Sequence, residues 1–427
     1  MKKTIILALA CFLAALTAEA QQYDVLDQVR SDARKSWGME GPHRFDGIPS
    51  LTQAPKGYKP FYVSHYGRHG SRYCSSAKTY TRIHTVLSKA QELGVLTPQG
   101  QAFAKEYESF YMESWINTGD LVPLGFEQHE RIGRFVYNHF SPVFKGDRRV
   151  EALASTAQRC ILSMSAFVQG LTARNGDLHV HQASNHMGMS IIAPPSAPDQ
   201  LLRHFKGEDD PVDMETAEAF AARKLSFESI LGRLFTDTSF LGQVKGGDDF
   251  LSDLWQFVTN YHNYEPRPLF DDLFTDDERV AAWEVDNYSS FYIDVNMRYA
   301  VIPLLEDILE KADAALADPS LAANLRFGHD YILEAFATLL NLNHCGAIPQ
   351  HPDEVKYWFQ SYNVPMAATL LFVLYRNRQG DVLFKVLWNE VEAVLPQLEP
   401  VQGPYYRWSD FVSWAQETLE AHPEIQS

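Results

Sequence analysis

The spacing of apolar and polar residues changes several times along this chain, and the changes predict alternating strands and helices. The short run Pro60–Val63 is apolar and aromatic, which favours a strand. Val150–Ala154, Leu178–His181 and Leu325–Phe327 predict further strands. Between them, apolar positions recur with the period of a helix that buries one face. The helices predicted on this basis are Ala77–Leu93, Gly100–Trp115, Phe126–Phe140 and Tyr331–Leu342.

Local signals mark two helix starts and one hairpin. Ser155–Gln158 has the Ser-x-x-Gln form of a capping box, in which each end residue satisfies a free N–H group of the other. The predicted apolar side of the helix that follows consists of Ile161, Leu162, Phe167 and Leu171. Asp330 stands where a carboxylate can cap the next helix. Ala368–Arg376 and Val382–Leu387 flank the polar segment 377–381, which predicts a β-hairpin.

Residues 200–317 differ from the rest of the chain, because their pattern is almost entirely helical and rich in Phe, Trp and Tyr. The order of elements predicts an α/β core of residues 21–200 and 318–427, with residues 201–317 as a mostly helical inserted domain. Ligands of such cores bind beyond the carboxyl ends of the strands, so the insertion is expected to form the other wall of a cleft. The candidates for its basic lining are Lys206, Arg223 and Lys224.

The N-terminus and the charge indicate where the protein acts and which partners it avoids. Met1–Lys3 is basic, Ile5–Leu16 is apolar, and small residues follow up to Ala20, which predicts a signal peptide over residues 1–20. We expect cleavage near Ala20 and a periplasmic or secreted protein without a membrane span. The formal net charge of −17 disfavours nucleic acid and anionic membranes as partners. These features do not indicate an oligomeric state.

The cysteines after the predicted signal peptide are Cys74, Cys160 and Cys345. They allow at most one disulfide within the chain, so the protein is not a disulfide scaffold. Cys74 and Cys160 lie close in sequence to the charged residues described next and could be neighbours in space. The favoured interpretation is that the cysteines are free and buried, where a thiol behaves as a small apolar group.

The run Ser64–Tyr73 carries the strongest chemical signal, because it combines arginines, histidines and glycines. Arg68 and Arg72 offer forked donors that match phosphate oxygens. A glycine turn from a strand into a helix would add free N–H groups for an anion. His69 lies between the arginines, where an imidazole could attack phosphorus. His65 lies on the strand itself and is expected to pack in the core.

Three segments of the chain resemble the histidine phosphatase superfamily. Arg68–Arg72 fits its Arg-His-Gly-x-Arg motif, and residues 155–170 resemble its second-arginine segment. Residues 327–333 resemble the His-Asp segment of its acid phosphatase and phytase branch. Multiple inositol polyphosphate phosphatases carry His-Ala-Glu there, where this chain has His329-Asp330-Tyr331. The resemblance implies an α/β fold, a histidine phosphatase (phosphoglycerate mutase-like) core with a mostly helical inserted domain.

The resemblance also implies a role for each matching residue. His69 would attack phosphorus and form a phosphohistidine, and Asp330 would give a proton to the leaving alcohol and then activate water. The phosphate-binding residues would be Arg68, Arg72, Arg159 and His329. Without the resemblance, the residues call for an arginine cluster and an acid, and leave His65 and His329 open as alternatives to His69. No metal ion and no cofactor is expected.

The chain is therefore expected to be an exported, metal-independent phosphomonoesterase for small phosphomonoesters, with inositol phosphates such as phytate among the candidates. A phosphomutase would use the same nucleophile, but the signal peptide argues against one that acts on cytosolic metabolites. A protein that only binds phosphate is a further alternative, which the presence of both His69 and Asp330 disfavours. Since a proton-donating Asp330 requires acidic conditions or a raised pKa, we expect the activity to be greatest at mildly acidic pH.

Overall fold

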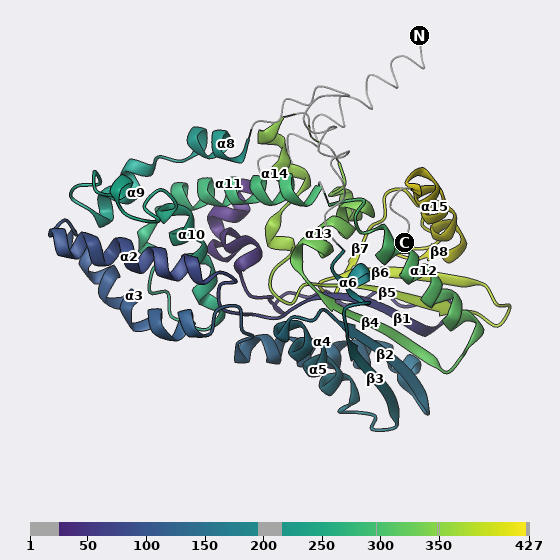
Figure 1. Ribbon diagram of the computed structural model, residues 1–427. Helices are drawn as coiled ribbons and strands as arrows, with labels where there is room; N and C mark the ends of the chain where they lie inside the picture. Colours follow the sequence, from purple (N-terminus) through teal and green to yellow (C-terminus); the bar gives the residue numbers. More distant parts are fainter. Residues whose placement is uncertain (1–24, 195–215, 296, 348, 350, 424–427) are drawn as a thin grey trace, which may run out of the picture.

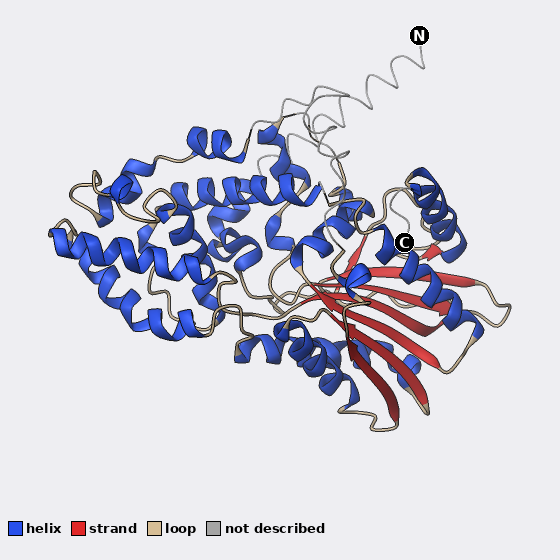
Figure 2. Cartoon of the chain, viewed as in Figure 1, coloured by secondary structure: helices blue, strands red, loops and turns tan. Residues whose placement is uncertain are grey.

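A mixed sheet forms one half of the molecule and helices form the other half (Figures 1 and 2). The computed structural model describes residues 25–194, 216–295, 297–347, 349 and 351–423. The predicted signal peptide and Lys206 lie outside the described residues. The strands are β1 (Lys59–Arg68), β2 (Arg148–Ala154), β3 (Leu178–Ser184), β4 (Leu321–Gly328), β5 (Thr369–Arg376), β6 (Val382–Trp388), β7 (Val391–Ala393) and β8 (Tyr406–Arg407).

The strand order is β3-β2-β4-β1-β5-β6-β7, and β8 pairs with β6. The first four of these strands are parallel to one another. β5, β6 and β7 continue the sheet in antiparallel pairs. The predicted hairpin is confirmed as β5 and β6. β4 lies between β2 and β1, although it comes much later in the chain.

Helices cover both faces of the sheet (Figure 1). α4 (Pro123–Phe140) and α5 (Gln158–Thr172) lie on one face. α12 (Ile302–Ala317), α13 (Asp330–Leu339) and α15 (Trp408–Ala421) lie on the other. The central strand β1 is therefore buried on both sides, and its side chains alternate between two apolar layers.

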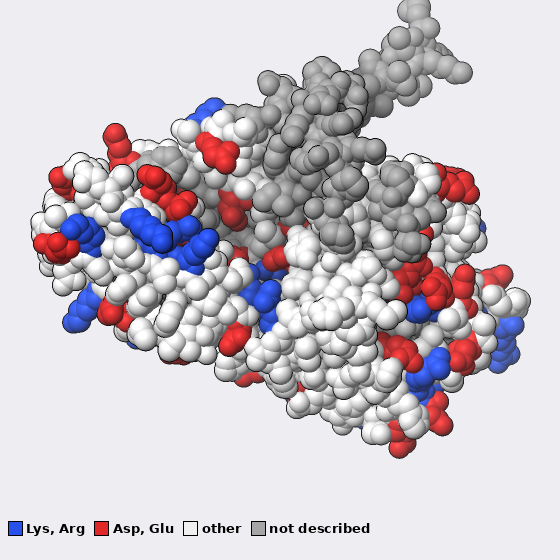
Figure 3. Space-filling view, in the orientation of Figure 1, with Lys and Arg blue, Asp and Glu red and all other residues white. Residues whose placement is uncertain are grey.

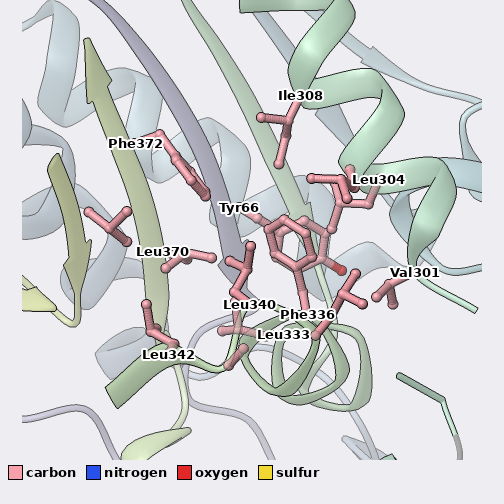
Figure 4. Close-up of a cluster of buried hydrophobic side chains, with 14 of the residues drawn as sticks. Tyr66, Val301, Leu304, Ile308, Leu333, Phe336, Leu340, Leu342, Leu370 and Phe372 are labelled. Carbon is pink, nitrogen blue, oxygen red and sulfur yellow. The ribbon is translucent and has the colours of Figure 1, made fainter. Parts of the chain in front are cut away.

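The two apolar layers are separate cores. Tyr66 of β1 points into the first, and Figure 4 shows it between Leu304 of α12 and Phe336 of α13. Val63 belongs to the second layer, which includes side chains of α4 and α5. His65 also faces this layer, and its ring centroid lies 4.9 Å from those of Phe167 and Phe327. His65 thus has the packing role expected from the sequence.

The helical half of the molecule has a third core, and it draws on distant parts of the chain. α2 (Ala77–Leu93), α3 (Pro98–Ile116), α9 (Phe227–Leu234) and α10 (Phe250–Asn260) contribute to this core. Among the described residues, the other helices of this half that are longer than one turn are α8 (Ala217–Lys224) and α11 (Asp276–Val295). The 3-10 segment η1 (Ala33–Glu40) packs against α10 and α11. By contrast, α12 packs on β1 and β4 of the sheet. The division of the chain into a core and an insertion of residues 201–317 stays a prediction.

Glycines allow α4 and α5 to touch backbone to backbone. A Cβ atom at Gly133 of α4 would lie 2.1 Å from the carbonyl oxygen of Phe167. A Cβ atom at Gly170 of α5 would lie 2.0 Å from the carbonyl oxygen of Glu130. Both distances are far below a van der Waals contact, so a larger residue would push the helices apart. This close packing fixes α5, whose first turn carries Arg159.

The predicted start of α5 is wrong in two respects. The N-cap of α5 is Ala157, which makes no side-chain hydrogen bond, so Ser155 and Gln158 do not form a capping box. The hydroxyl of Ser155 instead lies 2.9 Å from Nε2 of His329. Leu162 is 37% exposed and does not belong to the buried side of the helix. The predicted apolar side is correct at Phe167 and Leu171, and Leu162 lies nearly half a turn away from these two residues around the helix.

The helix after β4 also differs at its first residue. His329 is the N-cap of α13, and Asp330 is the first helical residue. Asp330 nevertheless accepts a hydrogen bond at Oδ1 from the N–H of Tyr331 (2.9 Å). One oxygen of its carboxylate is thus held by the backbone of the same helix turn, and the second oxygen, Oδ2, contacts Arg68.

The described cysteines Cys74, Cys160 and Cys345 are all free, and the first two are fully buried. The interpretation as buried thiols is confirmed for Cys74 and Cys160. Within the described ranges, no helix is both long enough and apolar enough to cross a membrane.

Candidate active site

The three charged segments meet at one edge of the sheet, as expected from the sequence. Arg68 at the end of β1 pairs in register with Gly328 at the end of β4. Ala154 at the end of β2 pairs with Phe327 of β4. The residues that follow these strand ends are therefore neighbours: His69 after β1, Ser155 after β2 and His329 after β4.

The backbone after β1 is fixed by buried side chains rather than by a helix. The N–H of Gly70 donates to Oγ of Ser163 (2.9 Å), and the N–H of Ser71 donates to Oε1 of Gln128 (2.9 Å). A Cβ atom at Gly70 would lie 2.4 Å from the carbonyl oxygen of Gly125, so glycine is required there. The helix after this turn, α2, begins at Ala77 as predicted, so the N–H groups of Gly70 and Ser71 belong to the preceding loop and not to a helix start. The helix starts at this edge are those of α5 and α13.

His69 is held as one neutral tautomer. Its Nδ1 lies 3.0 Å from the carbonyl oxygen of Gly70. A carbonyl oxygen can only accept, so the proton is on Nδ1 and the lone pair is on Nε2. Burial, and then the charges of the neighbouring arginines, lower the pKa of His69 well below its usual value of 6.5. The imidazole is therefore unprotonated at Nε2 across the mildly acidic range.

Arg68 is completely buried and forms an ion pair with Asp330. Its Nη2 donates to Oδ2 of Asp330 (2.6 Å), and its Nη1 donates to the carbonyl oxygens of Met39 (2.6 Å) and Val364 (2.8 Å). Burial alone would raise the pKa of Asp330, but the charges of Arg68 and Arg72 outweigh it and lower the pKa to about 2. Asp330 is thus a carboxylate in the ligand-free site.

Arg72 contacts a carboxylate that the sequence did not single out. Its Nη2 lies 3.4 Å from Oε1 of Glu40, which comes from η1 near the N-terminus. Oε2 of Glu40 accepts from Nδ2 of Asn260 on α10 (2.7 Å). Burial alone would lower the pKa of Arg72, but Glu40 raises it above its ordinary value. This contact connects the sheet edge to the helical half of the molecule.

Arg159 and His329 complete the cluster. Within the described part of the chain, Arg159 forms no ion pair, and the buried Nε atoms of Arg68, Arg72 and Arg159 have no hydrogen-bond partner. The charges of Arg68 and Arg72 act on Arg159, and all three act on His69, so this cluster of guanidinium groups is suited to an anion. Burial, and then the charge of Arg159, lower the pKa of His329 from 6.5 to about 4. A protonated His329 that donates to a phosphate therefore requires the anion to be bound.

The residues predicted from the sequence are thus brought together: His69, Arg68, Arg72, Arg159, His329 and Asp330. The rings of His69 and His329 lie 5.8 Å apart, edge to face. Ser155, Ser163, Gln128 and Glu40 were not predicted, because they act through folded contacts with distant residues. Ser155 was interpreted as part of a capping box, and its contact with His329 was therefore not predicted. Glu40 belongs to no local motif that indicates a contact with Arg72.

A cleft of about 960 Å³ adjoins Asp330 and extends between α13 and the helical half of the molecule. Its walls include η1, α2, α8, α10 and α11. Two of the basic residues proposed for this lining, Arg223 and Lys224, are not among the lining residues and form ion pairs with Asp353 at 2.9 and 2.5 Å. The net charge of −17 does not create one acidic face in the view of Figure 3, where acidic and basic side chains are interspersed.

The fold and the arginine cluster define an α/β protein with an anion site at the carboxyl ends of parallel strands. A sequence model described as the histidine phosphatase superfamily (branch 2) matches residues 67–389. The chain belongs to this family. A search of curated proteins gave no match.

Several solved structures share the fold. A multiple inositol polyphosphate phosphatase of Bifidobacterium longum in complex with inositol hexasulfate has a TM-score of 0.74 and 19% sequence identity, and the match covers 89% of this chain and 97% of the other. The phytase of D. castellii has a TM-score of 0.65 and 16% identity, over 93% and 86% of the two chains. The Hafnia alvei phytase has a TM-score of 0.58 and 17% identity, over 88% and 100%.

Proposed function

We propose that this chain hydrolyses phosphomonoesters through a phosphohistidine at His69, without a metal ion. The observation that carries the proposal is the tautomer of His69, whose Nδ1 proton is fixed by the carbonyl oxygen of Gly70. The low pKa leaves the Nε2 lone pair available. A neutral imidazole among three guanidinium groups is a nucleophile beside a site for a phosphoryl group.

The reaction would occur in two balanced steps. In the first, Nε2 of His69 bonds to phosphorus, the ester P–O bond breaks, and the leaving oxygen takes a proton from Asp330. In the second, water attacks phosphorus, the P–N bond breaks, and the Asp330 carboxylate takes the proton of the water. The donors of Arg68, Arg72 and Arg159 would stabilise the charge on the equatorial oxygens in both steps.

The proton on Asp330 has to arrive with the substrate. The ligand-free carboxylate is ionised because the pKa of Asp330 is about 2. A bound phosphate would compete for Arg68 and bring negative charge near Asp330, and both effects raise its pKa. A phosphomonoester with a second pKa of about 6 binds as a monoanion under mildly acidic conditions and supplies the proton. The expected activity is therefore greatest on the acidic side of neutrality.

Inositol phosphates are one substrate class to test, because the similar folds include phytases and a multiple inositol polyphosphate phosphatase. We also propose that residues 1–20 direct export and are removed near Ala20, which makes the protein periplasmic or secreted. N-terminal sequencing of protein recovered from the periplasm and the medium tests this. Intact Met1 on all recovered protein would contradict export by this route.

Phosphate release tests the catalytic proposal. Purified wild type, His69→Ala and the control His179→Ala are assayed with p-nitrophenyl phosphate at pH 5–7, with and without a chelator. His179 is a suitable control because its side chain is 74% exposed, on the edge strand β3. We expect chelator-resistant release by wild type and the control, and none by His69→Ala. Equal release by all three would refute the nucleophile. Phosphoryl transfer to an added alcohol without net release of phosphate would instead indicate a mutase.

A further inference from the structure

The usefulness of His329 as a phosphate ligand depends on the orientation of its ring. A guanidinium group presents several N–H donors, whereas an imidazole presents at most one at each of two nitrogens. Nε2 of His329 lies 2.9 Å from the hydroxyl of Ser155, so this nitrogen is already engaged by the protein. Nδ1 is therefore the nitrogen left for a phosphoryl oxygen.

Ser155 is itself held firmly at the end of β2. Its N–H donates to the carbonyl oxygen of Phe327 (2.9 Å), which extends the pairing of β2 with β4 by one residue. Its hydroxyl oxygen accepts from the N–H of Ala157 (3.3 Å), and the residue is only 1% exposed. A side chain that is locked by packing and hydrogen bonds can fix the ring that it contacts.

Other contacts on the His329 ring agree with a fixed orientation. The ring of Tyr331 is stacked on it at a centroid distance of 5.6 Å, and the ring of His69 meets it edge to face. The thiol of Cys160 lies 4.0 Å from Nε2, but it donates to a backbone carbonyl oxygen at 3.3 Å. Since a thiol is also the weaker hydrogen-bond partner, Ser155 is the group that holds Nε2.

A hydroxyl suits this position because it can both donate and accept a hydrogen bond. Ser155 can donate its proton to Nε2 of a neutral His329, and it can accept the Nε2 proton of a charged ring. In the ligand-free site His329 is neutral, because burial and then the charge of Arg159 lower its pKa to about 4. A bound phosphate would raise this pKa through its negative charge. Ser155 can thus hold the ring before and after it gains a proton.

We propose that Ser155 is a positioning residue, which holds Nε2 of His329 so that the N–H at Nδ1 donates to the phosphoryl group. Ser155 acts only through His329 and does not touch the substrate. The inference rests on the proposed function. A hydrogen bond to a charged group is stronger than one to a neutral group, so the contribution of Ser155 is greatest when phosphate is bound.

A double-mutant cycle tests whether Ser155 acts through His329. kcat/KM for p-nitrophenyl phosphate, the Kd of inorganic phosphate and the Tm are measured for wild type, Ser155→Ala, His329→Ala and the double variant, at one mildly acidic pH. Ser155→Ala alone should lower kcat/KM and weaken phosphate binding by ~10–100-fold, as for the loss of one hydrogen bond to a charged group. Added to His329→Ala, it should change either quantity by less than ~2-fold, because its partner is already absent.

Ser163→Ala is the matched control. Ser163 is fully buried like Ser155, but its hydroxyl accepts from the N–H of Gly70 and has no contact with His329. Its effect should be of the same size with and without His329→Ala. Equal losses from Ser155→Ala in both backgrounds would overturn the proposal, because Ser155 would then act by packing alone. An unchanged kcat/KM and Kd in Ser155→Ala would overturn it as well.

The two readouts separate this proposal from the phosphatase function. If the wild type binds inorganic phosphate but releases none from p-nitrophenyl phosphate, hydrolysis is refuted, and the cycle on Kd still decides the role of Ser155. If it hydrolyses the ester and the cycle shows no coupling of Ser155 with His329, the phosphatase function stands and the positioning role is refuted. A wild type that neither binds phosphate nor turns over the ester would refute both.

Discussion

Replacing Asp330 by asparagine separates proton donation from support of Arg68. The pKa of Asp330 is about 2 in the ligand-free site. At pH 5, protonating it without help from the substrate would cost about 4 kcal/mol, at 1.36 kcal/mol per pKa unit. The monoanionic ester offsets this cost, so kcat/KM of the wild type on an alkyl phosphate should fall ~10-fold per pH unit above a pH of about 6, where the ester loses its proton.

Asp330→Asn should lower kcat by ~10²–10⁴-fold on β-glycerophosphate, because the alkoxide leaving group needs the proton in the transition state. The same variant should lose far less on p-nitrophenyl phosphate, whose phenolate leaves without protonation. The assay is the kcat ratio of the two substrates, measured for wild type and variant between pH 4.5 and 7.5. An equal loss on both substrates would refute proton donation and leave Asp330 as the ion-pair partner of Arg68.

Asp307→Asn is the matched control for this experiment. Asp307 of α12 pairs with Arg326 of β4 at 2.5 Å and is nearly buried, like the pair of Asp330 with Arg68. It lies outside the cleft and the arginine cluster. We expect Asp307→Asn to lower the Tm and leave the kcat ratio of the two substrates unchanged. A changed ratio in this control would show that lost stability alone alters leaving-group preference.

Two further predictions concern stability. Gly170→Ala should destabilise the protein by at least ~1–3 kcal/mol, because its Cβ would lie 2.0 Å from the Glu130 carbonyl oxygen. The control is Gly232→Ala in α9, whose Cβ would have no described atom within 4 Å. This substitution should be neutral or stabilise the protein by ~0.4–1 kcal/mol. Urea unfolding measures both, and equal effects would contradict the close packing of α4 and α5. Burial lowers the pKa of His129 from 6.5 to about 3, so the unfolded chain takes up this proton first and the free energy of unfolding should fall as the pH drops from about 6.5 towards 3. Stability that stays constant over this range would contradict the neutral His129.

The sequence predicts the elements that have strong local patterns. α2 occupies the predicted residues Ala77–Leu93, and the β5–β6 hairpin lies where its polar turn indicated. The charged motifs predicted the sheet edge, because each follows a strand. The position of β4 between β2 and β1 depends on pairing across the whole sheet, which no local spacing records.

The site residues that the sequence did not predict have partners that lie far away in the chain. Ser155 has the sequence of a cap, but its hydroxyl contacts His329, 174 residues away in the chain. Glu40 reaches Arg72 from an irregular N-terminal segment without a motif. Arg223 and Lys224 were also wrong candidates for the lining of the cleft, since both bind Asp353. In each case the partner is chosen by tertiary packing.

The place of β4 has a consequence for the time at which the protein acquires its chemistry. The strand between β1 and β2 is supplied by Leu321–Gly328, after the helical segments have been made. During synthesis, β1 and β2 therefore exist for a long time without their shared neighbour, and contacts so distant in sequence form slowly. His69 and Arg159 cannot share a phosphate until that strand is inserted. On the proposed function, the growing chain would have no activity until the sheet is complete.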